Sequence, residues 1–144
     1  MTEYKYQHLF EEHQLTCESL TKGIKINSRA YRWVVGPIDH NLNFLPNILY
    51  DIAKSSPRRI NSLQDQMKCG YCALSFFTSK DAAINKYKSL PTRAQSLIGY
   101  NHIAEGELTD NDGVISEIHN DHFNLFEYIS TDLKERFVLT SQLI

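Results

Sequence analysis

The stretch Cys69-Gly-Tyr-Cys-Ala-Leu-Ser-Phe-Phe-Thr-Ser79 decides the fold prediction, together with the segment that follows it. Residues 71–77 are apolar and aromatic and predict a strand. The two hydroxyl residues that end the stretch can cap a helix, and Pro91 ends that helix because proline cannot continue it. A second strand is predicted over residues 97–108. The sequence therefore predicts a strand, a helix and a strand in succession.

The segments on either side of this stretch predict more strands than helices. Apolar residues spaced three and four apart predict an amphipathic helix over residues 3–22. Residues 29–35 are rich in aromatic and β-branched side chains and predict a strand. No alternation of strand and helix is sustained, so the predicted class is α+β, with a mostly antiparallel sheet, an N-terminal helix and one central helix. Further strands are predicted over residues 114–118, 122–129 and 137–144.

The composition is that of one ordinary globular domain spanning residues 1–144. The net charge is −2, and the densest basic group, Lys54, Arg58 and Arg59, is too small for a nucleic-acid surface. We expect a cytoplasmic protein without a membrane partner, because no signal peptide and no apolar run near about 20 residues is present. The polar segment 55–68 is interpreted either as a flap over a site or as a surface loop.

Three cysteines raise the question of redox or metal chemistry. Cys69 and Cys72 have the spacing of a redox pair, but a thioredoxin-type motif has a strand before it and a helix after it, which is the reverse of the order predicted here. An odd number of cysteines favours reduced thiols over a disulfide framework. We therefore expect small, half-buried, reduced thiols and no metal. A zinc site would need two further ligands, and the candidates are Cys17, His102, His119 and His122.

Two polar turns are candidate cation sites. His119, Asp121 and His122 fall in one predicted turn, where polar residues are expected without any ligand. Residues 110–113 read Asp-Asn-Asp-Gly and resemble part of a calcium loop. The EF-hand pattern fails, because Leu108 stands at the position of its first Asp.

The pair Glu105-Gly-Glu107 is a candidate acid/base site. Residues two apart in a strand project to the same face, so these carboxylates should lie side by side. If the face is solvated, the pair is an ordinary charged surface. If the face lines a cleft, repulsion between like charges would raise one pKa and create an acid/base pair.

Three motifs resemble those of the ADP-ribosyltransferase fold. That fold uses a strand arginine, then a Ser-Thr-Ser-type segment on a later strand, then a downstream Glu-x-Glu. The corresponding order here is Arg32 in Tyr-Arg-Trp-Val, then Ser75-Phe-Phe-Thr-Ser, then Glu105-Gly-Glu. The resemblance implies that NAD is the substrate and that the protein is a toxin-like or defence-related enzyme.

The resemblance also implies roles for individual residues. Arg32 would hold a phosphate or ribose of NAD by charge-assisted hydrogen bonds, and Ser75 or Thr78 would brace the site. Glu107 would bind the nicotinamide ribose and stabilise its oxocarbenium-like transition state, while Glu105 would help to activate the acceptor. This hypothesis requires Arg32, Ser75 and Glu107 to converge on one cleft.

The alternative function is a non-enzymatic module that binds a protein partner through an aromatic-rich surface. The alternating run over residues 122–128 fits an edge strand in such an interface, but a core strand is the preferred interpretation of this run. The aromatic residues proposed for that surface are Trp33, Phe44, Phe123, Phe126 and Tyr128.

Overall fold

The computed structural model describes residues 3–54 and 63–143. Most of the polar segment predicted as a flap or loop, including Arg58 and Arg59, lies outside the described residues. In the described part of the chain, no helix has the length and apolar character needed to cross a membrane.

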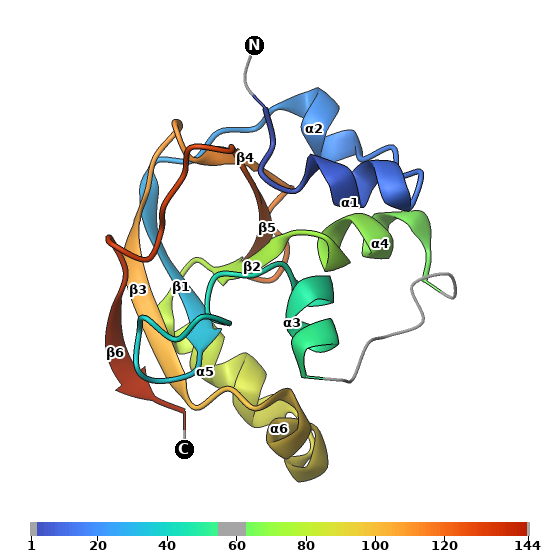
Figure 1. Ribbon diagram of the computed structural model, residues 1–144. Coiled ribbons are helices and arrows are strands. Elements are labelled where there is room, and N and C mark those ends of the chain that lie inside the picture. Colours follow the sequence, from blue (N-terminus) through green and yellow to red (C-terminus); the bar gives the residue numbers. More distant parts are fainter. Residues whose placement is uncertain (1–2, 55–62, 144) are drawn as a thin grey trace.

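The strands of the described residues form one six-stranded sheet in the order β4-β5-β2-β1-β3-β6, with every neighbouring pair antiparallel. This arrangement confirms the predicted α+β class with a mostly antiparallel sheet (Figure 1). The strands are β1 (Ser28–Val34), β2 (Leu74–Phe77), β3 (His102–Leu108), β4 (Gly113–Ile115), β5 (His122–Glu127) and β6 (Val138–Gln142).

The helices differ most from the prediction. The helix expected over residues 3–22 is interrupted near Gln14, whose φ of 54° is left-handed, and becomes two short helices. The strand expected from residue 97 begins only at His102, because the chain turns into a helix after Pro91. The helices are α1 (Gln7–Glu12), α2 (Glu18–Lys22), α3 (Asn47–Ala53), α4 (Asp65–Tyr71), α5 (Lys80–Ser89) and α6 (Thr92–Ile98). Figure 1 shows α1 to α4 gathered at the side of the sheet away from β6.

The sheet has two faces, because successive side chains of a strand alternate in direction. The inner face carries the largest apolar cluster, and Phe44 and Tyr6 pack over that cluster. The opposite, outer face carries Trp33 and Phe77, which pack against α5 through Ala83. The inner-face residues of β1, β2, β3 and β5 are Ala30, Arg32, Val34, Leu74, Phe76, Ala104, Leu108, Phe123 and Leu125.

The sheet divides between β1 and β2. Their pairing has a single registered pair, Tyr31 with Phe77. Along the rest of β2 and at Ala73 just before it, other groups bind carbonyls that a neighbouring strand would otherwise bind. The backbone N–H of Asn47 donates to the Ala73 carbonyl (3.3 Å), and the Arg32 guanidinium donates to the Ser75 carbonyl (3.1 Å). The carbonyls at the division are therefore satisfied by α3 and by a side chain of β1.

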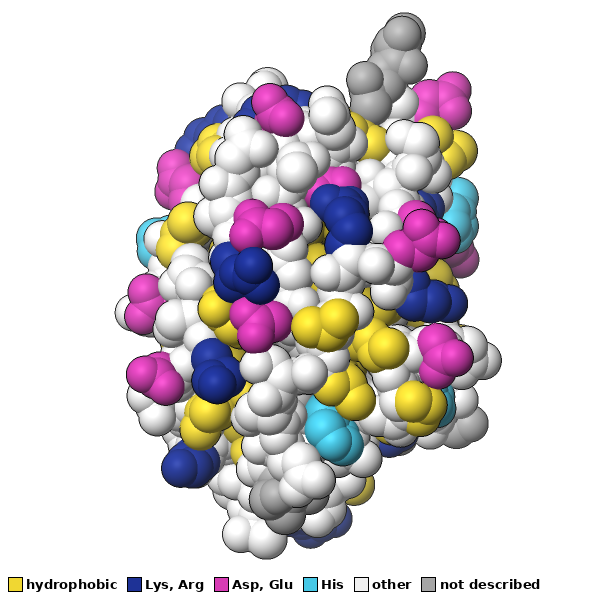
Figure 2. Space-filling model, turned by 90° about the vertical axis from the view of Figure 1, so that its left-hand side faces the viewer, with side chains coloured by type: hydrophobic (Ala, Val, Ile, Leu, Met, Phe, Trp, Pro, Cys, Tyr) yellow, Lys and Arg dark blue, Asp and Glu magenta, His cyan; other side chains and the backbone are white. Residues whose placement is uncertain are grey.

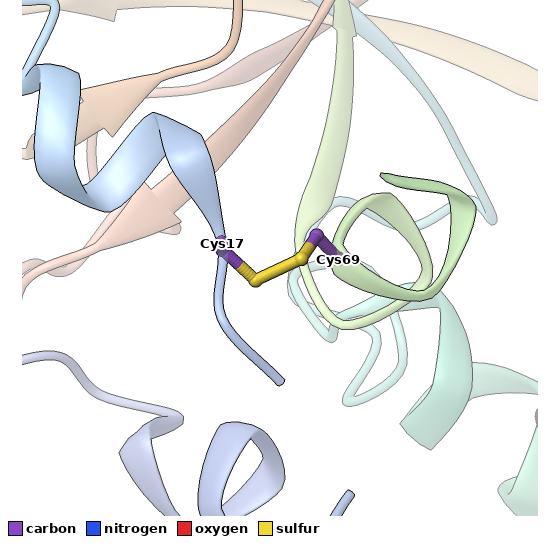
Figure 3. Close-up of a disulfide and its surroundings, with 2 residues drawn as sticks. All are labelled: Cys17 and Cys69. Carbon is purple, nitrogen blue, oxygen red and sulfur yellow. A yellow bond between two sulfur atoms is a disulfide. The ribbon is translucent and has the colours of Figure 1, made fainter. Parts of the chain in front are cut away.

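Cys17 and Cys69 form a disulfide, so the prediction of reduced thiols was wrong for these two residues. Their Cα atoms are 5.8 Å apart, and Figure 3 shows the bond joining the start of α2 to α4. Cys72 keeps a free, buried thiol. An odd count of cysteines does not prevent two of them from pairing, and the pairing depends on a distance between segments that spacing along the chain does not contain.

Removal of the disulfide by the double substitution Cys17→Ser and Cys69→Ser will lower the free energy of unfolding. The two cysteines are 52 residues apart, and a cross-link over that length should restrict the unfolded chain by about 4 kcal/mol. Urea unfolding with and without reductant measures the loss. The wild-type protein in reductant should match the double variant, which should not itself respond to reductant. Equal wild-type stability in both buffers would contradict the disulfide.

Candidate functional site

Arg32 is a buried cation at the division of the sheet. It lies on the inner face of β1 and is 2% exposed. Its Nη1 donates to the Ser75 carbonyl, and its guanidinium lies 5.2 Å from the ring centre of Phe76 and 5.8 Å from that of Phe44. Burial lowers the pKa of Arg32. Its Nε is buried without a hydrogen-bond partner.

Glu127 is a buried anion on the same face. It ends β5 two residues after Leu125, and the alternation of the strand directs it inward, where it is 2% exposed. Lys5 Nζ lies 2.9 Å from its Oε2. Its Oε1 is buried without a partner. Burial raises the pKa of Glu127, although Lys5 and Arg32 each oppose that rise.

The two groups share one property. Each has one atom held by the protein and one atom free, so the site offers a free donor on Arg32 and a free acceptor on Glu127. In the described residues, these are the buried side-chain nitrogen and oxygen atoms that lack a partner. Nearly all buried polar groups in proteins are hydrogen-bonded. Each of these two atoms is therefore a position at which a ligand group or a water molecule could supply the missing hydrogen bond.

Tyrosines surround the charged pair. Tyr6 interacts electrostatically with both Arg32 and Glu127, and burial raises the pKa of Tyr6 to about 12. Tyr50 and Tyr100 stack with ring centres 4.6 Å apart, and both also interact with Arg32. Aromatic rings of this kind provide flat surfaces for a planar ligand as well as apolar packing.

The segment after β1 covers the site. Asn43 is completely buried, and its amide donates to the carbonyls of Val35, Pro37 and Ile38 while its Oδ1 accepts from the Val35 N–H. These bonds fold residues 35–43 back on themselves, and Phe44 is thereby placed over Arg32. Since Arg32 is 2% exposed among the described residues, a ligand that binds it must displace side chains that now cover it, such as Phe44.

A cavity of about 490 Å³ adjoins the tyrosines. Tyr100 lines this cavity and also interacts electrostatically with Arg32. Polar side chains of α6 and of the start of β3 form much of the remaining wall, among them Thr92, Gln95, Ser96 and Asn101.

Glu105 and Glu107 share a face, as predicted, but that face is not the one carrying Arg32. In the β1–β3 register Arg32 lies opposite Ala104, whereas Arg29 lies opposite Glu107. Arg29 binds both carboxylates, at 3.0 Å from Glu105 and 3.3 Å from Glu107. Hydrogen bonds from Thr140 and then Arg29 hold the pKa of Glu105 below its usual value.

The predicted convergence of Arg32, Ser75 and Glu107 was therefore wrong for the glutamate. Successive side chains of a strand point to opposite faces of the sheet. Because Arg32 pairs with Ala104, Glu105 and Glu107 point to the face opposite to that of Arg32. Figure 2, viewed from the side of β3 and β6, shows acidic and basic side chains interspersed over that surface. The Glu105-Gly-Glu107 pair belongs to a solvated, ion-paired surface.

Of the two residues predicted to brace the site, Ser75 contacts Arg32 and Thr78 does not. Ser75 does meet Arg32, but through its main-chain carbonyl, because its hydroxyl accepts from the Asn47 amide (3.2 Å). Thr78 lies beyond the end of β2 and bonds to Asp121 through both its N–H and its hydroxyl. Thr78 is thus a turn residue that does not contact Arg32.

Sequence reasoning missed Glu127. The available signal was its place in the alternating run of β5, at the position that continues the core register of Phe123 and Leu125. A charged residue at a core position of a strand is rarely fully buried unless it is paired. The prediction instead emphasised two acids close together in sequence.

The proposed aromatic surface is largely interior. Phe123 and Phe126 are buried in the two main core clusters, and Trp33 packs on Phe77 and Tyr87 while donating to the Ala83 carbonyl. The run in β5 is therefore a core strand.

His122 and His119 adjoin a second cavity, on the other side of β5 from Glu127. This cavity has a volume of about 400 Å³ and lies between α2, α4 and the β4–β5 hairpin. Burial lowers the pKa of His122. No cluster of three or more His, Cys, Asp or Glu side chains suited to a metal ion occurs within residues 3–54 and 63–143.

No protein-family model, no curated protein and no solved structure matches this chain. Roles for Arg32 and Glu127 therefore follow from their positions in the sheet, their burial and their free atoms.

The substitution Arg32→Met will lower the free energy of unfolding by about 1 to 3 kcal/mol, because it leaves the buried Ser75 carbonyl without its donor and removes a cation that opposes the rise in the pKa of Glu127. Urea unfolding measures the change. The matched control is Arg29→Met on the outer face of the same strand, where removal of an exposed ion pair should change stability by less than about 1 kcal/mol. Stability of Arg32→Met equal to or above that of Arg29→Met would show that this hydrogen bond is not needed to close the division of the sheet.

The substitution Glu127→Gln will change how stability depends on pH. The pKa of Glu127 in the folded protein lies above 4.5, so this carboxyl favours folding below pH 4.5 and that contribution is lost as pH rises through the raised pKa. Glutamine does not titrate. Relative to wild type, the variant should therefore gain stability as pH increases from 4.5 upward. Urea unfolding across this pH range tests the expectation, and a constant difference between the two proteins would refute it.

Proposed function

We propose that this protein binds NAD and cleaves its nicotinamide–ribose bond, in the manner of an ADP-ribosyltransferase, with Arg32 and Glu127 as the principal residues. The observation that supports the proposal is the pair of free, buried, oppositely charged atoms on one face of the sheet. The strand arginine and its neighbour Ser75 follow the order of the resemblance. Glu107 lies on the other face from Arg32, so the role that the resemblance gave to Glu107 fails, and the proposal assigns that role to Glu127 instead.

Arg32 suits the anionic part of NAD. The diphosphate carries negative charge and offers acceptor oxygens, and a guanidinium binds such groups with charge-assisted hydrogen bonds. Anchoring of Nη1 by Ser75 fixes the plane of the guanidinium while Nε remains available. A phosphate would also supply the counter-charge that buried Arg32 lacks within hydrogen-bond distance.

Glu127 suits the reacting ribose. When the bond between the ribose C1′ and the nicotinamide nitrogen breaks, the bonding electrons leave with nicotinamide and positive charge develops on the sugar. A carboxylate in a dry site stabilises that charge strongly. Attack of water on C1′, with loss of a proton, then yields ADP-ribose. The free Oε1 is the atom that would face the sugar.

The resemblance implies a second acid, two residues before the first, that activates the acceptor. No acid stands at that position relative to Glu127. Leu125 stands two residues before Glu127, and Glu105 lies on the outer face. We therefore assign water as the first acceptor to test, because it needs no dedicated carboxylate two residues before Glu127.

Nicotinamide release from NAD, followed chromatographically, and the melting temperature with millimolar NAD test this proposal. The wild-type protein should release nicotinamide and melt at a higher temperature with NAD, since a ligand of the folded state stabilises it. Arg32→Met should weaken NAD binding at least about tenfold, and Glu127→Gln should reduce turnover by about 100-fold or more.

Arg29→Met and Glu107→Gln are the matched controls, because they remove the same side-chain types from the outer face of β1 and β3. Both should behave as wild type. Absence of release and of any melting shift in the wild-type protein would refute the proposal. Loss of activity in Glu107→Gln with full activity in Glu127→Gln would refute the reassignment of the acid.

A further inference from the structure

The segment before α1 lies against the end of β5 and brings Lys5 to Glu127. Tyr4 and Tyr128 form an antiparallel bridge. On either side of it, the Lys5 N–H donates to the Glu127 carbonyl (2.9 Å) and the Ile129 N–H donates to the Glu3 carbonyl (2.8 Å). These backbone bonds set the register of the segment and place the Lys5 side chain beside the carboxylate.

The Lys5 ammonium group binds two acceptors. Its ammonium lies 2.9 Å from Glu127 Oε2 and also donates to the Thr131 carbonyl. The Glu127 side chain is 1% exposed, whereas that of Lys5 is 28% exposed. The ammonium thus approaches from the solvent side and binds one carboxylate oxygen, and Oε1 remains without a partner.

We propose that Lys5 is a positioning residue for the reaction assigned to Glu127: it orients the carboxylate through Oε2 and supplies its counter-charge, so that Oε1 stays free for the ribose. This inference rests on the proposed function. Lys5 lies far from Glu127 in sequence and belongs to none of the motifs that suggested the activity.

The physical need for Lys5 follows from burial. A buried carboxyl group tends to stay protonated, and a neutral acid would stabilise the cationic sugar poorly. Lys5 opposes the rise in the pKa of Glu127 both as a charge and as a hydrogen-bond donor, and Arg32 opposes it as a charge, whereas Asp112 promotes it. Two further groups interact with Glu127 electrostatically, namely Tyr6 and Arg136.

The test compares the pH profile of nicotinamide release for Lys5→Met, Lys5→Arg and wild type. Activity should rise with pH as Glu127 ionises. In Lys5→Met this rise should move to higher pH by about one unit, equivalent to about 1.4 kcal/mol of lost interaction with the carboxylate. Lys5→Arg should keep the wild-type profile, since it retains the charge and the donor.

Lys25→Met is the matched control, because Lys25 contacts the neighbouring Tyr128 from an exposed position. It should leave the profile unchanged. Unfolding by urea over the same pH range gives a second measurement that does not need activity. The free energy of unfolding of Lys5→Met is compared with that of the double variant Lys5→Met and Glu127→Gln. The pH range over which these two values diverge should lie higher than the corresponding range for wild type and Glu127→Gln.

The outcomes separate the two proposals. If wild type releases nicotinamide and Lys5→Met keeps its pH profile, the role of Lys5 is overturned and the proposed function stands. If wild type releases no nicotinamide, the proposed function fails and the positioning role fails with it. If Lys5→Met shifts both the activity profile and the unfolding profile while Lys5→Arg shifts neither, the role of Lys5 is supported.

Discussion

The hydrogen bond from Arg32 to the Ser75 carbonyl closes the point at which the sheet divides. β1 and β2 share a single registered pair, so the carbonyls along the rest of β2 need donors from elsewhere. Asn47 at the start of α3 supplies one, and the arginine supplies the other. Both the helix that follows β1 and the charge in the core are therefore consequences of this division, because a buried carbonyl without a donor would be costly.

The same arrangement places charge where the fold would otherwise be apolar. Arg32 and Glu127 lie on a face made largely of Phe, Leu, Ala and Val side chains, and each retains a free atom. Desolvation of such groups opposes folding by several kcal/mol for each ion. Packing of the aromatic core around Phe76 and the ion pair with Lys5 offset part of that cost. Buried polar atoms without hydrogen-bond partners are expected where a ligand supplies the missing hydrogen bonds.

The disulfide acts at a distance from the charged pair. It ties the start of the short helix α2 to α4, which packs on β2. Helices of five to seven residues are marginal by themselves, so their positions depend on such ties and on the cluster around Phe10, Tyr71 and Phe126. The N-terminal segment that carries Lys5 continues directly into α1.

The sequence alone determined the fold class, the strands around residues 29–35 and 122–129, and the later part of the strand expected over residues 71–77, because alternation and β-branched or aromatic content are local properties. The first part of that last segment, up to Tyr71, instead belongs to α4. It also determined that Glu105 and Glu107 share a face. Only the tertiary structure decided which face that is, since facing depends on the register between β1 and β3. The same holds for the Cys17–Cys69 bond and for the meeting of Lys5, Arg32 and Glu127. These contacts join segments far apart in the chain, and the pairing of strands, which local sequence does not encode, is what brings them together.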